Sequence, residues 1–191
     1  MAKKSSLQPA DRLADRLNYL PIAVFGLWLG PILHVWMQLF GPMLPFAWAP
    51  PTSPPLPWFS GAVVAGLAML LLPPGWYRVR HFERGLYQTL GLRHFRRWAT
   101  NGDAIVRAVR RRHPSYTVHG REFAQALANT LIGEKSHLAL LMFGVVTSGY
   151  LVAVGWYGWA AWTMASNAIG NLYPVLLQRY TRDRLARLAI T

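Results

Sequence analysis

The sequence contains no cysteine among its 191 residues. A disulfide framework and a thiolate metal site are therefore both excluded, and cysteine usage gives no information on the compartment. Charged residues are also scarce, at 14% of the chain, whereas a soluble domain has about 25%. Together with 53% hydrophobic residues, this composition predicts an integral membrane protein.

Motifs of several common enzyme classes are missing as well. The sequence has no G-x-S-x-G element of serine hydrolases, no P-loop and no glycine fingerprint for a dinucleotide. Zinc sites can use His and Glu at helical spacing, but no H-E-x-x-H motif accompanies the six scattered histidines. We therefore expect no metal and no cofactor.

Four apolar stretches are candidates for membrane spans, since about 20 apolar residues are needed to cross the hydrocarbon core as a helix. The predicted spans cover residues 20–41, 58–77, 137–155 and 157–178. The second is the least regular, because Pro73 and Pro74 disfavour helix at Leu72. The sequence thus predicts an all-α, polytopic membrane protein that forms a single domain with about four transmembrane helices.

Positive charge is distributed very unevenly between these spans. Lys and Arg number four before the first span, twelve in residues 78–136 and four after the last span, and the two remaining loops have none. Basic residues accumulate on the cytoplasmic side of a membrane. We therefore expect segment 78–136 and both termini to be cytoplasmic, in a multi-pass protein of the inner (plasma) membrane.

The cytoplasmic segment 78–136 has the pattern of basic amphipathic helices that lie at a membrane surface. In LRHFRRW (92–98) and AIVRAVRRR (104–112) apolar residues and arginines fall on opposite faces, and REFAQALANTLI (121–132) is a third candidate. Anionic lipid headgroups are the simplest partner for this charge. A phosphorylated or thioester-bearing substrate is a second possibility. Nucleic acid is not expected, because much of the charge flanks apolar spans.

Glu134 and His137 are three residues apart, so one helical face would carry both. A carboxylate beside an imidazole can orient the ring and favour its charged form. Such a histidine could act as the general base for a hydroxyl that attacks an acyl group. The same two residues are also ordinary at a helix start and at a membrane interface, so this short pattern leaves both interpretations open.

The last predicted span carries a polar stripe that continues into a basic tail. Asn167, Asn171, Gln178 and Arg182 follow one another by four, seven and four residues, which keeps them on one side of a helix. Pro174 lies between them and releases a backbone carbonyl from its helical hydrogen bond. The stripe is suited to a ligand that is polar at one end and apolar at the other, and equally to packing between helices.

Three stretches resemble one known family in order and spacing. They are FERGLYQTLGLRHFRRWATNGD at 82–103, EKSH at 134–137 and NLYPVLLQRYTRDRL at 171–185. Over about residues 82–188 the sequence resembles the glycosyl-4,4'-diaponeurosporenoate acyltransferase family, named for an enzyme that esterifies a sugar hydroxyl on a glycosylated carotenoid. The departures are mild: Thr181 stands where the family commonly has Asn, and Ala99-Thr100 where it often has a proline.

The resemblance implies roles for individual residues. His137 would deprotonate the acceptor hydroxyl, and Glu134 would orient it and stabilise the imidazolium. Arg179 and Arg182 would hold donor phosphates or the developing oxyanion. The other positions that match family motifs, and are expected to bind substrate, are Asn171 and Gln178, which would hold sugar hydroxyls, together with Glu83, Arg96, Arg97, Tyr180 and Arg184.

The function implied by the resemblance is transfer of a fatty acyl group from a cytoplasmic thioester donor to a hydroxyl of a glycosylated carotenoid or other glycolipid. The alternative is a non-catalytic assembly factor or a subunit that binds anionic lipid, in which the arginines act through charge alone. A small lipid transporter is a third option, although no inverted repeat is visible. The sequence implies no particular oligomeric state.

Overall fold

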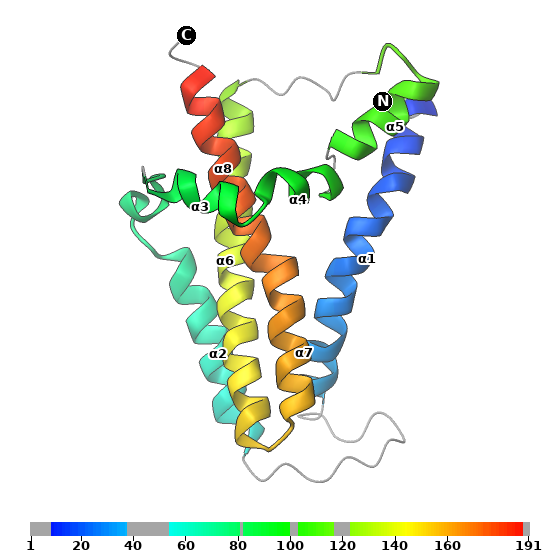
Figure 1. Cartoon of the computed structure of the whole chain (residues 1–191). Helices are drawn as coiled ribbons and strands as arrows, with labels where there is room; N and C mark the ends of the chain where they lie inside the picture. Colours follow the sequence, from blue (N-terminus) through cyan, green and yellow to red (C-terminus); the bar gives the residue numbers. More distant parts are fainter. Residues whose placement is uncertain (1–8, 38–53, 81, 100–102, 117–122, 189–191) are drawn as a thin grey trace, which may run out of the picture.

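The computed structural model describes residues 9–37, 54–80, 82–99, 103–116 and 123–188. Within these ranges every regular element is helical, which confirms the predicted all-α class. Long helices α1 (Pro9–Met37), α2 (Pro55–Leu70), α6 (Phe123–Ala153), α7 (Tyr157–Asn167) and α8 (Tyr173–Leu188) form a bundle (Figure 1). Short helices α3 (Glu83–Thr89) and α4 (Leu92–Trp98) run across α8, and α5 (Asp103–Arg112) packs on α1.

Helices α7 and α8 are two parts of one continuous helix, joined by the π-helical turn Ala168–Leu172. Pro174 lies two residues after this turn, and its ring nitrogen has no hydrogen to donate to the carbonyl of Gly170. A wider turn is one of the local adjustments that accommodate such a proline, and π-turns are frequent at functional sites. The helix continues well past residue 178, where the last predicted span ends.

Helix α6 begins at Phe123, far ahead of the predicted start at residue 137. The third predicted amphipathic segment, 121–132, therefore forms the first turns of a long helix where it is described, and this corrects the prediction of a separate interfacial helix. Ala128–Ala153 is the one helical stretch in the described residues that is long and apolar enough to cross a membrane, judged by length and composition.

The other predicted spans differ from the structure at their ends. Helix α2 stops at Leu70, and the chain then passes through a short 3-10 turn, Pro74–Tyr77, so the predicted span 58–77 is not one continuous helix, as expected from Pro73 and Pro74. The Tyr77 hydroxyl donates to the Met69 carbonyl at 2.7 Å and ties this turn to the end of α2. Residues 38–41 of the first predicted span lie outside the described residues.

The main core is formed by aromatic and aliphatic side chains of α1, α2, α6 and α7. Trp36 stacks on Tyr150 with ring centroids 5.2 Å apart, and its indole N–H donates to the Thr147 hydroxyl at 3.1 Å. Helices α2 and α6 approach closely at Gly66, where a Cβ would lie 3.1 Å from the Ala139 carbonyl oxygen. Small residues allow this kind of close helix packing.

The outer surface of the bundle is apolar over much of its length. Exposed large side chains on α1, α2 and α7 include Leu20, Leu27, Leu33, Leu56, Val64, Leu67, Trp159 and Trp162. The arginine-rich α5 and the C-terminal end of α8 lie at the opposite end of the molecule from the α6–α7 turn (Figure 1). Extended apolar surface of this kind is an interaction surface.

Candidate active site

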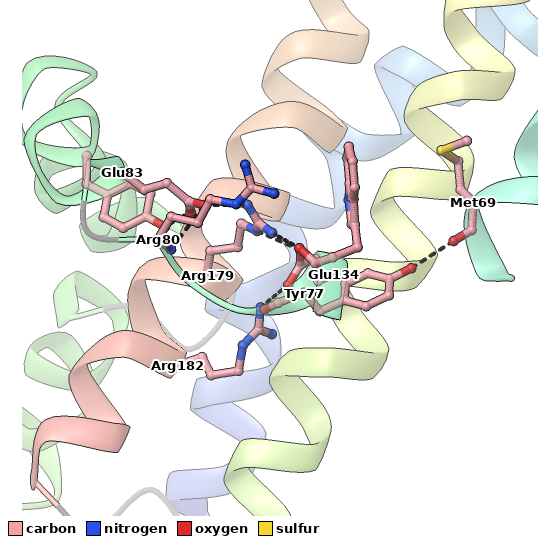
Figure 2. A network of polar contacts seen from close by, with 9 residues as sticks. Met69, Tyr77, Arg80, Glu83, Glu134, Arg179 and Arg182 are labelled. Carbon is pink, nitrogen blue, oxygen red and sulfur yellow. Dashed lines mark hydrogen bonds and ion pairs between the residues drawn. The ribbon is translucent and has the colours of Figure 1, made fainter. Parts of the chain in front are cut away.

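A buried ionic network joins α3, α6 and α8 (Figure 2). The Nε of Arg179 donates to Glu134 Oε1 at 2.7 Å, and its Nη1 donates to Glu83 Oε1 at 2.9 Å. The Nη2 of Arg182 donates to Glu134 Oε2. The Glu134 side chain is fully buried, and both its oxygens have a cationic partner. With two arginines and two glutamates, the charges of the network balance, as burial of ions requires.

The same arginines bind the backbone of the turn after α2. Arg179 Nη2 donates to the Trp76 carbonyl at 2.6 Å, and Arg182 Nη2 donates to the Tyr77 carbonyl at 2.7 Å. All three nitrogens of Arg179 are thus bonded within the protein. A guanidinium spreads its donors over three nitrogens in a fixed plane, whereas an ammonium has all its donors on one nitrogen. The predicted contact of Arg179 with donor phosphates does not fit this geometry, in which the side chain holds the fold together.

Tyr87 extends the network at Glu83, and Asp183 forms a separate group of ion pairs on α8. The Tyr87 hydroxyl donates to Glu83 Oε2 at 2.6 Å. Burial, together with this hydrogen bond to a carboxylate, raises the pKa of Tyr87 well above its ordinary value, so the phenol is neutral at physiological pH and remains a donor. Asp183 pairs with Arg84 at 2.9 Å and with Arg187 at 3.0 Å.

His137 is oriented by Asn171, not by Glu134. Its Nδ1 lies 3.1 Å from Asn171 Oδ1. The Asn171 amide in turn donates to Asn167 Oδ1 at 2.8 Å, and the Asn167 amide donates to the Leu141 carbonyl at 2.9 Å. The prediction that Glu134 orients the imidazole is therefore wrong, because the Glu134 carboxylate faces the two arginines. A hydrogen-bond partner on one ring nitrogen sets the orientation and the basicity of the imidazole.

A pocket of about 600 Å³ lies between α1, α4, α6 and α8, and among the described residues His137 and Gln178 are the polar side chains in its lining. The Gln178 amide packs on Gly133, where a Cβ would come within 3.0 Å of it. Most of the remaining lining is apolar and includes Ile22, Phe25, Phe95, Trp98, Ile169 and Leu177. An apolar cavity with a few placed polar groups is the usual form of a small-molecule site.

A second pocket, of about 740 Å³, is strongly basic. Helices α4 and α8 line both this pocket and the apolar pocket. Helix α4 contributes Phe95 and Trp98 to the apolar pocket and arginines to the basic pocket. Among the described residues, the lining of the basic pocket has one acidic side chain, Asp183, and seven arginines, which are Arg84, Arg93, Arg96, Arg97, Arg107, Arg184 and Arg187. Such a lining favours phosphate or carboxylate groups.

The structure sorts the predicted site residues into three places. Glu83, Glu134, Arg179 and Arg182 form the ionic network; His137, Asn171 and Gln178 form the polar side of the apolar pocket; Arg96, Arg97, Tyr180 and Arg184 line the basic pocket. Tyr87 was missed, although its spacing of four residues from Glu83 placed the two on one helical face. The α1 wall of the apolar pocket gave no signal in the sequence.

Residues 73–190 match the family described as glycosyl-4,4'-diaponeurosporenoate acyltransferase, CrtO. This range is more than half of the chain and contains the ionic network, His137 and the basic pocket. The chain belongs to this family. The family name implies an acyltransferase that acts on a glycosylated carotenoid. The α1 wall of the apolar pocket lies outside the matched range. No curated protein and no solved structure matches the chain.

Proposed function

We propose that this protein transfers a fatty acyl group from a cytoplasmic thioester donor to a hydroxyl of a glycosylated carotenoid or another glycolipid. The observation that carries the proposal is the position of His137, which lines an apolar pocket and is held through Nδ1 by Asn171. Membership of an acyltransferase family supports it. A base of this kind is what attack of a hydroxyl on an acyl group needs.

In the proposed reaction Nε2 of His137 takes the proton of the acceptor hydroxyl while the hydroxyl oxygen attacks the thioester carbonyl carbon. The tetrahedral intermediate collapses with cleavage of the carbon–sulfur bond, and the imidazolium returns its proton to the thiolate that leaves. Asn171 Oδ1 holds the ring during both transfers and stabilises the imidazolium through Nδ1. Gln178, on the same pocket wall, is placed to hold a sugar hydroxyl.

The basic pocket supports a donor that carries anionic groups. Arg96, Arg97 and Arg184 line it beside Tyr180, and guanidinium groups bind phosphates in bidentate fashion. Because α4 lines both pockets, a donor anchored by its phosphates would extend its acyl chain past α4 toward His137. In this proposal Arg96, Arg97 and Arg184 bind the donor phosphates, in place of Arg179 and Arg182.

We also propose that the bundle crosses the inner membrane four times, as a single domain with both chain ends in the cytoplasm. The apolar helix Ala128–Ala153 and the exposed leucines on α1 and α2 support this arrangement. The arginine-rich α5 and the end of α8 lie at the same end of the bundle, as the charge rule requires. The apolar pocket would then receive a lipid-like acceptor from the bilayer.

A second function has one observation in its favour. The basic pocket alone would also bind anionic lipid headgroups, as expected of a non-catalytic lipid-binding subunit or assembly factor. Such a protein has no need for an oriented histidine in an apolar pocket. The two functions therefore differ in what removal of His137 does.

The test is His137→Ala in purified protein reconstituted in lipid nanodiscs with a long-chain acyl thioester and a membrane lipid extract. Mass spectrometry compares acylated products with those of wild type. General base catalysis contributes about 10²–10⁴-fold, so we expect a loss of that order. Ser136→Ala is the matched control, because the exposed Ser136 hydroxyl bonds only the Ile132 carbonyl of its own helix. Unchanged turnover in His137→Ala would remove this residue from the chemistry.

A further inference from the structure

A series of hydrogen bonds links His137 through Asn171 and Asn167 to the Leu141 carbonyl, and all of them donate in the same direction. That direction is fixed at the last member, because the Leu141 carbonyl can only accept. Asn167 must therefore turn its amide NH₂ toward that oxygen, which points its own Oδ1 at Asn171. Asn167 and Asn171 are both fully buried, so water is not available to satisfy a reversed amide.

The same logic passes through the second amide to the ring. Asn171 meets an oxygen of Asn167, so it must donate its NH₂ there and present Oδ1 to His137. An oxygen accepts, so Nδ1 of His137 must carry a hydrogen. A neutral imidazole has one ring N–H, which leaves the lone pair on Nε2. Reversing either amide would bring two oxygens or two NH₂ groups face to face in a buried site.

We propose that Asn167 is a positioning residue that fixes the tautomer of His137 through Asn171, with the proton on Nδ1 and the basic lone pair on Nε2. This inference rests on the proposed function for its catalytic meaning, because only a base for a hydroxyl makes the tautomer matter. Asn167 is not among the residues that line the pocket, so its effect on the reaction is exerted through the two intervening hydrogen bonds.

The surrounding helices are shaped to hold this amide in place. A Cβ at Gly144 would lie 2.5 Å from Asn167 Nδ2, so the glycine on α6 provides the space that Asn167 occupies. The π-turn Ala168–Leu172 begins directly after Asn167 and includes Asn171. The turn that interrupts the regular helix therefore also spans the hydrogen bond between the two amides.

The experiment is ¹⁵N NMR of the full-length protein labelled at histidine, in nanodiscs at about pH 8.5, well above the ordinary histidine pKa of about 6.5. Signals of His137 are identified by their loss in His137→Gln. We expect protonated Nδ1 and unprotonated Nε2, with the Nδ1–H tautomer in at least ~10-fold excess, given the cost of an unsatisfied buried group. In Asn167→Ala the other tautomer should become populated, and Ser166→Ala should leave the spectrum as in wild type.

Turnover gives a second readout. Asn167→Ala should lower kcat for acyl transfer by about 10–100-fold, as loss of an outer hydrogen-bond partner does elsewhere, with little change in KM. A proton on Nε2 in the wild-type spectrum overturns the inference, and this measurement needs no variant that could misfold. If the wild-type spectrum is as expected but His137→Ala still transfers acyl groups, the proposed function fails and the tautomer assignment stands.

Discussion

Glu134 Oε1 and Arg179 Nε are 2.7 Å apart in the interior of the protein, although their residues lie on different helices. This ion pair changes what substitutions of the arginine can show. From the sequence, a change of Arg179 and Arg182 to Lys would separate a bidentate substrate site from a patch that acts by charge alone. In the structure both guanidinium groups bond several protein acceptors, so Lys would damage the fold whatever the function is.

We therefore predict that Glu134→Gln and Arg179→Lys each lower the free energy of unfolding by about 3–5 kcal/mol, the usual result of breaking a buried ion pair. The Gln variant leaves two arginines with one carboxylate, and the Lys variant cannot reach three acceptors at once. Thermal unfolding in detergent, followed by tryptophan fluorescence, measures the effect. Arg111→Lys, on an exposed position of α5, is the control. A stable Glu134→Gln protein would show that the network is not needed for folding.

The basic pocket predicts a defect in donor binding. Replacing Arg96 and Arg97 together by Gln should raise KM for the thioester donor by about 10-fold or more. Each factor of ten corresponds to about 1.4 kcal/mol of binding free energy. Activity of the wild type should also fall with rising salt, since partly exposed charges are screened. Initial rates at varied donor concentration give KM.

The matched control for the basic pocket is Arg111 with Arg112, both changed to Gln. These residues lie in α5 outside the pocket lining, and their removal changes the net charge by the same amount. An equal increase in KM for both double variants would mean that the arginines act through general attraction to anionic lipid or donor. A specific site requires that only the pocket variant loses affinity.

Tyr87→Phe tests the phenol that binds Glu83. A hydrogen bond to a charged group contributes about 1.5–3 kcal/mol, and we expect this loss of stability at neutral pH. Because the pKa of Tyr87 is raised in the folded protein, its contribution is fully present below about pH 10, the ordinary tyrosine pKa, and decreases as pH rises above that value. The difference in melting temperature between wild type and variant should therefore narrow at alkaline pH. The melting temperature of Tyr157→Phe, a change at an exposed position, should follow that of wild type at every pH.

The sequence predicted the helical class, but not how the polar residues would pair. Residues Glu134 and His137 are on one helix, and spacing alone placed them on one face. Spacing does not show what packs against that face. In the folded protein Arg179 and Arg182 of α8 engage the carboxylate, and Asn171 reaches the imidazole. Partners supplied by another helix depend on tertiary packing, which a local pattern does not contain.

Helix ends were predicted less well for a similar reason. Apolar composition indicates which residues can lie in lipid, but it does not indicate where the helix begins. Helix α6 starts at Phe123 because no proline or glycine cluster interrupts the polar residues before the apolar run. At α2 the opposite holds: Pro73 and Pro74 end the helix inside the predicted span, as the proline rule indicated.

Gly144 offers a way to disturb Asn167 without changing any polar group. In Gly144→Ala the new Cβ would lie 2.5 Å from Asn167 Nδ2 and 2.7 Å from its Cγ. The Asn167 amide is hydrogen-bonded to the Leu141 carbonyl and to Asn171, so it cannot move aside without breaking a buried hydrogen bond.

Overpacking of this kind costs about 1–3 kcal/mol, and we expect Gly144→Ala to unfold at lower temperature and to lose acyl transfer more than stability alone explains. Gly26→Ala is the matched control, since a Cβ there meets nothing within 4 Å, and alanine in a helix is more favourable than glycine by about 1 kcal/mol. Melting curves and initial rates on the two variants give the comparison. If Gly144→Ala retains wild-type rates and the wild-type tautomer of His137, then the position of Asn167 does not govern the base.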